Sequence, residues 1–131
     1  MTHDDVQAWL DRYVAAWETY DPDAIGLLFN EDAEYRYHPW EEPIRGRAAI
    51  VSSWVAPEGD ASSRDAPGSW TATYRPYAVV GDRAVATGQS DYVATGQAPA
   101  RTYHNCFVLE FDSDGRCRSF SEYFMKEPAA G

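Results

Sequence analysis

The chain has 131 residues, the size of one ordinary domain, and 44% of them are hydrophobic, close to the average for folded globular proteins. Its formal net charge is −10, from 21 acidic and 11 basic residues, and no segment gathers Lys or Arg into a stripe that could follow a phosphate backbone. These features predict a single domain over residues 1–131 and argue against nucleic acid as a partner.

No apolar run approaches the ~18 residues that a membrane span requires, and the N-terminal residues lack the basic and apolar regions of a signal peptide. We therefore expect a cytoplasmic protein without membrane contact. The two cysteines, Cys106 and Cys117, and the three histidines lack the spacing of a redox pair or a metal site. We expect reduced core thiols, no metal and no cofactor.

The first predicted element is an amphipathic helix over residues 3–19. Thr2 and Asp5 resemble a capping box at its start. Apolar residues then recur at helical spacing: Val6, Trp9, Leu10, Tyr13, Val14 and Trp17. A brief second helix begins at Pro22, since Asp21 can cap it and proline fits the first helical position.

The pattern changes from helical to alternating within residues 30–39. Tyr35 and Tyr37 fall on one side of a short strand, Arg36 and His38 on the other, and Pro39 interrupts the strand. A third helix is expected over residues 47–55. Residues 56–69, rich in Pro, Gly and Ser, predict an exposed loop that either closes as a lid or is simply mobile.

Four long strands are predicted from Trp70 onward, over residues 70–80, 83–95, 101–111 and 116–125. Each is rich in β-branched or aromatic residues, and Gly, Pro and Asp mark the breaks. Helices followed by a meander of strands predict an α+β domain, in which three N-terminal helices cover one face of a curved antiparallel sheet.

The last hairpin has two candidate registers, which differ in the residues that share a face with Glu122. A type I turn with Gly115 in the left-handed region pairs Asp112 with Arg116, and counting outward makes His104 and Glu122 diagonal neighbours. A two-residue Asp-Gly turn shifts the pairing by one and places Asn105 and Phe107 there instead. We expect the first register.

The order of these elements resembles the SnoaL-like branch of the nuclear transport factor 2-like superfamily. The segments that carry the resemblance are "EYRYHP", "PIRGRAAI" and "DSDGRCRSFSEYF", and it covers nearly the whole chain. Members fold as a cone, with a curved sheet and helices around a deep apolar pocket, and often pair through the outer face of the sheet. The resemblance thus implies a small hydrophobic ligand and a homodimer. The aromatic residues suit either an open pocket or a filled cone.

Two enzyme types of this superfamily fit poorly. In the pattern of limonene epoxide hydrolases, the arginine between the two carboxylates Asp91 and Glu122 is Gln89, and the asparagine is Tyr37. In the pattern of ketosteroid isomerases, Tyr37 also occupies the position of the aspartate base. A tyrosine with a pKa near 10 is a poor base at neutral pH.

Polyketide cyclases of the SnoaL type, and related dehydratases, transfer protons with a histidine or a carboxylate. By this resemblance, the candidate catalytic residues are Glu122, Asp91 and His104, with the pKa of Glu122 raised by apolar surroundings. The candidate substrate-binding residues are Tyr35, Tyr37, Trp17, Trp54, Gln89 and Phe120. An acid–base enzyme, a non-catalytic binding module and a purely structural dimer remain open, and Asp91 and Glu122 can cooperate only from the same face of the sheet.

Overall fold

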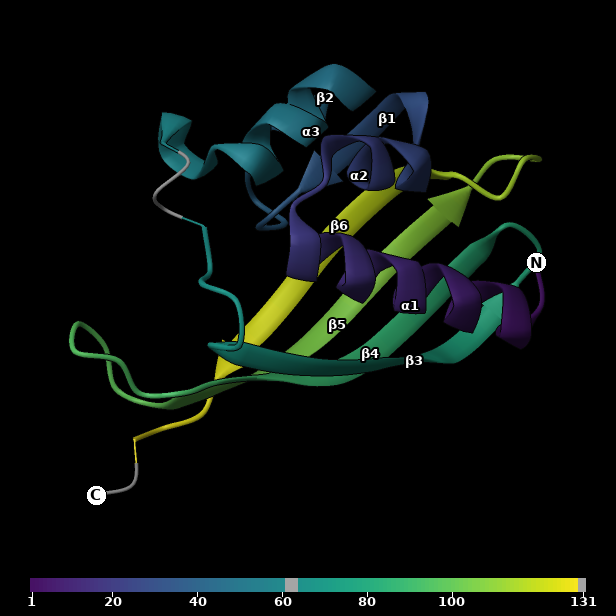
Figure 1. The fold of residues 1–131 in the computed structure, drawn as a ribbon. Coiled ribbons are helices and arrows are strands. Elements are labelled where there is room, and N and C mark those ends of the chain that lie inside the picture. The colour runs from purple at the N-terminus through teal and green to yellow at the C-terminus, as the bar shows by residue number, and fades with distance from the viewer. Residues whose placement is uncertain (61–63, 130–131) are drawn as a thin grey trace.

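A computed structural model describes residues 1–60 and 64–129 of the chain (Figure 1). The helices are α1 (His3–Thr19), α2 (Pro22–Leu28) and α3 (Arg47–Val55), with a 3₁₀ turn over Pro57–Gly59. The strands are β1 (Phe29–Arg36), β2 (Ile44–Arg45), β3 (Trp70–Val80), β4 (Arg83–Tyr92), β5 (Arg101–Phe111) and β6 (Cys117–Lys126). The structure confirms the predicted α+β class and the three helices.

The six strands form one curved sheet in the order β2-β1-β6-β5-β4-β3. The sheet is mixed, because β1 runs parallel to β6 while every other pair is antiparallel. The predicted all-antiparallel sheet is therefore wrong at this one pair. Figure 1 shows α1 lying across the concave face and α2 and α3 at its upper edge, so the helices and the sheet together make a cone.

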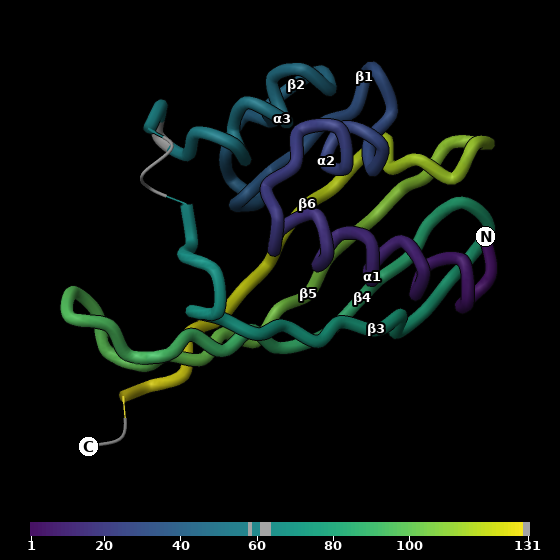
Figure 2. The backbone as a smooth tube through the Cα atoms, in the orientation of Figure 1, coloured from purple at the N-terminus to yellow at the C-terminus, as the bar shows by residue number. Residues whose placement is uncertain are grey.

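Local signals in the sequence position the first two helices. The Thr2 hydroxyl accepts a hydrogen bond from the Asp5 amide, and the Asp5 carboxylate accepts one from the Thr2 amide, which completes the predicted capping box. Asp21 caps α2, with Pro22 at its first position. The N-terminal ammonium donates to Gly81 O at 3.3 Å, and Figure 2 shows this end of the chain beside the turn between β3 and β4.

An aromatic core fills the narrow part of the cone. Trp9 lies at its centre, packed edge-on against Phe29 and Phe111, and its indole Nε1 donates to Leu28 O at 3.0 Å. The other largest fully buried side chains are Tyr35, Phe107, Phe120, Leu10, Ile25, Leu28, Ile50, Leu109 and Val6. Cys117 is buried, but Cys106 is only half-buried, on the outer side of the sheet, so the prediction of two core thiols is wrong for Cys106. Both are free.

The register of the last hairpin differs from the expected one although its turn does not. Asp112 pairs with Arg116, and Gly115 adopts a positive φ of 79°, as the first alternative requires. A β-bulge at Arg118 then adds one residue to β6, so Glu110 lies opposite Ser119 and Phe107 lies opposite Glu122. The expected pairing of Cys106 with Glu122 is therefore wrong, and the faces follow the second alternative.

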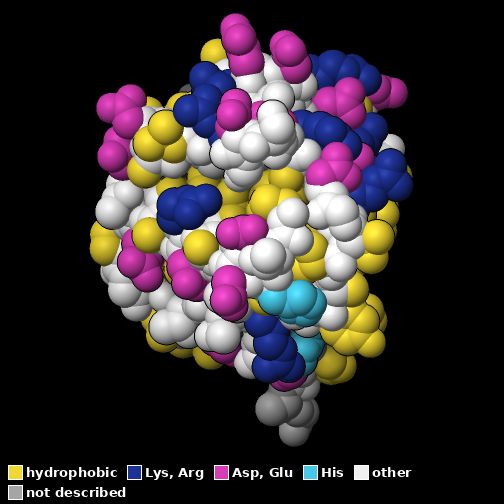
Figure 3. Space-filling view, turned by 90° about the vertical axis from the view of Figure 1, so that its right-hand side faces the viewer, with side chains coloured by type: hydrophobic (Ala, Val, Ile, Leu, Met, Phe, Trp, Pro, Cys, Tyr) yellow, Lys and Arg dark blue, Asp and Glu magenta, His cyan; other side chains and the backbone are white. Residues whose placement is uncertain are grey.

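Two further observations concern the surface. No helix in residues 1–60 and 64–129 is long and apolar enough to cross a membrane. On the face drawn in Figure 3, basic side chains are interspersed with acidic ones, and hydrophobic side chains are exposed between them. This face offers no continuous basic stripe to an anionic polymer.

Candidate functional site

A hollow of about 670 Å³ lies at the wide end of the cone, beyond the aromatic core. Its wall comes from the C-terminal half of α1, from α3, from β1 and the residues after it, and from the other five strands. Aromatic rings make up half of the lining residues: Tyr13, Trp17, Tyr20, Tyr35, Tyr37, Trp54, Tyr74, Tyr92, Tyr103 and Phe124. This volume lies within the range of roughly 300–1,000 Å³ that is typical of ligand sites.

The inner face of the sheet changes character where the hollow begins. Along β5 the inward residues run from Phe111, Leu109 and Phe107 in the core to Asn105 at the hollow. The neighbouring strands contribute Ser90 and Glu122 to the same region. Hence three polar side chains, one from each of three adjacent strands, replace the apolar packing at this end of the sheet.

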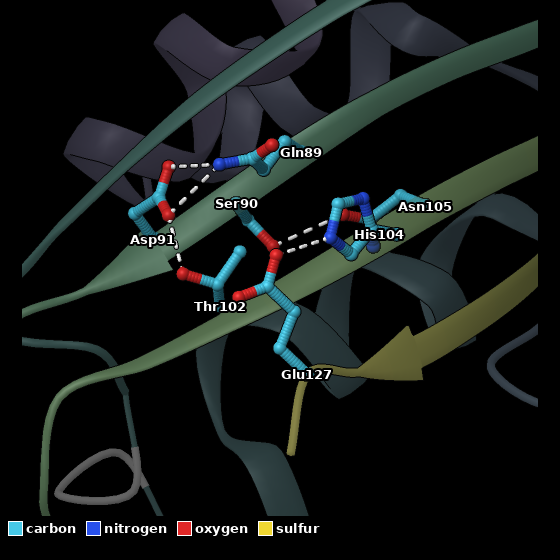
Figure 4. A network of polar contacts seen from close by, with 7 residues as sticks. All are labelled: Gln89, Ser90, Asp91, Thr102, His104, Asn105 and Glu127. Atoms are coloured by element: carbon cyan, nitrogen blue, oxygen red, sulfur yellow. Dashed lines mark hydrogen bonds and ion pairs between the residues drawn. The ribbon is translucent and has the colours of Figure 1, made fainter. Parts of the chain in front are cut away.

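These three polar side chains form one chain of hydrogen bonds. Ser90 Oγ donates to Asn105 Oδ1 at 3.1 Å, and Asn105 Nδ2 donates to Glu122 Oε1 at 3.1 Å. Figure 4 shows the Ser90–Asn105 contact between β4 and β5. Because an amide nitrogen can only donate, Asn105 orients Glu122 through a bond that a carboxylate and a neutral carboxyl can both accept.

Burial raises the pKa of Glu122 from its ordinary value of 4.5 to about 7. The hydrogen bond from Asn105 and the charge of His38 act in the opposite direction, and loss of hydration outweighs them. None of the ion pairs in the described part of the chain includes Glu122. The side chain can therefore both give and take a proton near neutral pH.

Tyrosine phenols surround this carboxyl group. Burial raises the pKa of Tyr13 and of Tyr35 well above 10, and that of Tyr37 to about 12. The pKa values of Tyr74 and Tyr92 are raised for the same reason, and Glu122 contributes to all five shifts. The phenols thus remain protonated at neutral pH and act as hydrogen-bond donors.

Hydrogen bonds and ring stacking orient three of these phenols, those of Tyr13, Tyr35 and Tyr37. The hydroxyls of Tyr13 and Tyr35 lie 3.4 Å apart, and the Tyr35 ring stacks on Phe120 with centroids 4.3 Å apart. Ser53 Oγ donates its one proton to Ile50 O at 2.7 Å. The Tyr37 hydroxyl lies 3.1 Å from Ser53 Oγ and therefore donates to Ser53 Oγ. Tyr13 and Tyr35 each carry one hydroxyl proton, and the hydrogen bond between them uses only one of the two. The other proton can be donated to a ligand.

The rim of the hollow carries two further carboxylates. Asp65 accepts hydrogen bonds from Trp17 Nε1 at 3.0 Å and from the Tyr20 hydroxyl at 3.5 Å. Glu41 is bonded to His38 Nδ1. Asp65 belongs to the predicted loop over 56–69, of which residues 61–63 lie outside the described residues. The described part is thus fastened to the end of α1, and the prediction that the loop acts as a lid stays a prediction.

Four of the predicted substrate-binding residues line the hollow. Trp17 and Trp54 come from α1 and α3, and Tyr35 and Tyr37 come from β1 and the residues just after it. Phe120 is fully buried in the core beneath the Tyr35 ring and does not line the hollow. The buried Trp54 Nε1 has no hydrogen-bond partner within the described residues.

The other predicted residues lie on the opposite face of the sheet. Gln89 donates to both oxygens of Asp91, at 3.1 and 3.2 Å, and the Thr102 hydroxyl donates to Asp91 at 2.6 Å (Figure 4). His104 Nε2 lies 2.6 Å from Glu127 Oε1, near the end of the chain. The shared site of Asp91, His104 and Glu122 is therefore not formed. The bulge moves Glu122 to the inner face, while Asp91 and His104 remain outside.

Sequence reasoning missed the polar partners of Glu122. Ser90 and Asn105 alternate with Gln89 and His104 along their strands, so an error of one residue in register exchanges the two sets. The second register pointed to Asn105. The sequence of β5 contained a signal for the inner face, because every second residue from Phe111 back to Phe107 is large and apolar. Continuing this alternation by one step leads to Asn105.

A second hollow, of about 800 Å³, lies at the opposite end between the N-terminus and the β5–β6 turn. Asp5, Arg12 and Arg118 are among its lining residues. Hydrogen bonds lower the pKa of Asp5, and Arg118 is paired with Asp82 and Glu110. This hollow thus offers solvated or paired charges, whereas the first one contains a carboxyl group that titrates near neutrality. Among the described residues, no group of three or more His, Cys, Asp or Glu side chains could hold a metal ion.

Comparisons with known proteins agree with the fold. A crystal structure of an NTF-2-like protein of unknown function from Burkholderia xenovorans LB400 has a TM-score of 0.68 and 18% sequence identity, covering 98% of this chain and 88% of that chain. A search of curated proteins found no match. A family model described as the SnoaL-like domain matches residues 10–120 and ends just before Glu122. The chain therefore belongs to the SnoaL-like family, and its fold is similar to that of the NTF-2-like protein.

Proposed function

We propose that the protein is a small-molecule enzyme of the acid–base type, in which Glu122 moves a proton on a largely apolar substrate held in the wide-end hollow. The observation that carries this proposal is the half-buried carboxyl group of Glu122, which lines a hollow of about 670 Å³ and whose pKa is raised to about 7. A group that titrates near the working pH is the most effective general acid or base.

The surrounding residues suggest how the proton would move. Ionised Glu122 removes a proton from a carbon next to a carbonyl group, and the electron pair of the broken C–H bond passes to the carbonyl oxygen. A protonated phenol of the Tyr13–Tyr35 pair donates a hydrogen bond to that oxygen, where negative charge develops. The electron pair then returns from the oxygen as Glu122 gives up a proton. Delivery to another, conjugated carbon gives an isomerisation, and delivery to the same carbon after the carboxyl group has exchanged its proton with solvent gives hydrogen exchange. Asp91 and His104 take no part, since they lie on the outer face.

Exchange of the α-hydrogens of 2-tetralone in deuterium oxide, followed by proton NMR, tests this proposal. The wild-type chain is expected to accelerate the exchange, and Glu122→Gln to lose about 10²–10⁴ of that acceleration. His104→Gln is the matched control, because it changes a titratable group outside the hollow. Equal exchange by wild type and Glu122→Gln would refute the acid–base role. Binding without exchange would favour a non-catalytic binding module.

We also propose that two copies pair through the outer face of the sheet, as the resemblance implied. Val108, Tyr123 and Met125 lie on that face with exposed fractions of 43%, 46% and 77%. Burying such side chains stabilises a dimer. Sedimentation equilibrium is expected to give twice the monomer mass, and Tyr123→Lys to weaken the association.

A further inference from the structure

Of the three carboxylates that line the wide-end hollow, Glu41 is paired with His38, and the other two are Glu122 and Asp65. Glu34, Glu110 and Glu127 are paired with Arg or His side chains. Within the described residues, neither Glu122 nor Asp65 has such a partner; each accepts only hydrogen bonds from uncharged groups. A buried carboxylate without an opposite charge is unfavourable, and a cation brought by a ligand would offset that cost.

The walls of the hollow are suited to a cation. The faces of tyrosine and tryptophan rings attract positive charge, more strongly where water is excluded. Two of the lining tyrosines contact a cationic side chain. The Arg101 guanidinium lies 4.3 Å from the Tyr92 ring centroid, and the Arg64 guanidinium lies 5.3 Å from the Tyr20 ring centroid. The same kind of surface continues inward around Glu122, among the rings of Tyr13, Tyr35 and Tyr37.

The charges that face Glu122 favour a cation overall. The segment after β1 contributes His38 with its bound Glu41, the loop before β3 contributes Asp65, and β5 contributes Arg101. The phenols described above, from α1, β1 and its following residue, β3 and β4, are neutral. Three carboxylates thus line the hollow with one guanidinium and one imidazole, and the formal net charge of −10 draws cations toward the protein from a distance.

We propose that the wide-end hollow binds an organic ammonium ion attached to a flat apolar ring, with Glu122 as its counterion and the tyrosine rings around it. This rests on the hollow being the ligand site of the proposed function and adds the class of ligand. Positive charge beside Glu122 keeps the carboxylate ionised, which is the form that accepts a proton, and an ammonium group also acidifies the C–H bonds next to it.

The test compares two probes of equal shape, (2-naphthylmethyl)trimethylammonium and its neutral carbon isostere 2-neopentylnaphthalene. Binding is measured by tryptophan fluorescence at pH 8 and pH 6. At pH 8 the cation is expected to bind at least tenfold more tightly than the neutral probe. Because Glu122 titrates near pH 7, the affinity for the cation is expected to fall about tenfold at pH 6, while that for the neutral probe stays constant.

Two variants separate Glu122 from the other groups. Glu122→Gln is expected to lose the preference for the cation at pH 8 and most of its pH dependence. Glu127→Gln, which removes a carboxylate from the outer face, is expected to keep both. Equal binding of the two probes to the wild-type chain, binding of neither, or a preference that survives in Glu122→Gln would overturn the inference.

This result is independent of the exchange assay. If Glu122→Gln abolishes exchange of 2-tetralone but the wild-type chain shows no preference for the cation, the inference fails and the proposed acid–base function stands. If the cation is preferred and no exchange is accelerated, the acid–base function fails and the ligand class stands. Should the variant fold poorly, the preference of the wild-type chain for the cation over its neutral isostere at pH 8 decides the question.

Discussion

Replacing Glu122 by glutamine is expected to stabilise the folded protein, and more so at higher pH. The folded chain holds the Glu122 proton with a pKa of about 7, whereas the ordinary value is 4.5. Between these two values the folded state binds more protons than the unfolded state, so the free energy of unfolding falls as the pH rises through this window. The shift corresponds to roughly 3 kcal/mol, reached above pH 7. Glutamine cannot ionise and does not lose this stability.

The assay is urea denaturation of wild type and Glu122→Gln at pH 4, 5, 6, 7 and 8. The difference in unfolding free energy, variant minus wild type, is expected to rise by up to about 3 kcal/mol across the series and to level off above pH 7. Glu31→Gln, at an exposed position of β1, is the control and is expected to give a flat difference. A flat difference for Glu122→Gln as well would refute the claim that burial destabilises the ionised carboxylate.

Three other substitutions test the sheet, its outer face and the aromatic core. Gly88→Ala is expected to lower the free energy of unfolding by more than about 2 kcal/mol in urea denaturation, because an added Cβ would lie 2.1 Å from a backbone oxygen of β3. Gly96→Ala is the control, because the space around Gly96 is open, and its free energy of unfolding is expected to match that of the wild type. His104→Ala is expected to leave ligand affinity unchanged in a fluorescence titration, and a tenfold loss would contradict its place on the outer face. Trp9→Phe is expected to cost about 1–3 kcal/mol, because Leu28 O loses its buried donor; an unchanged midpoint would contradict that role.

Most of the fold could be predicted because its signals are local. The capping box at Thr2, the proline at the start of α2 and the glycine of the last turn each fix the backbone through contacts within a few residues. The strands over residues 70–80 and 101–111 begin and end where composition changes. The parallel pair of β1 and β6 was missed because it joins segments about 90 residues apart, and no local pattern records which strands become neighbours.

The candidate site could be predicted only in part, because it depends on one extra residue in β6. The turn at Asp112 was predicted correctly, yet the bulge at Arg118 reverses which side chains of β6 accompany those of β5. The Arg118 side chain pairs with Glu110 and Asp82, from two other segments. Such a bulge is held by contacts across strands, so the sequence of the hairpin alone did not reveal it.

Aromatic walls were easier to predict than polar contacts. Tyr35, Tyr37, Trp17 and Trp54 are large and amphipathic, and the sequence analysis named all four as candidate substrate-binding residues. The roles of small polar residues follow from register instead. Asn105 and Glu122 are hydrogen-bonded because both lie on the inner face of their strands, and the register of the hairpin determines that face.

The protonation of Glu122 in the folded protein is the most direct test of the account. Carboxyl carbon-13 NMR of glutamate-labelled chain, with Glu122→Gln to assign the resonance, measures its midpoint between pH 4 and pH 9. The account predicts a midpoint of about 7. A midpoint near the ordinary value of 4.5 would show a hydrated carboxylate and would contradict its role as a buried acid–base group.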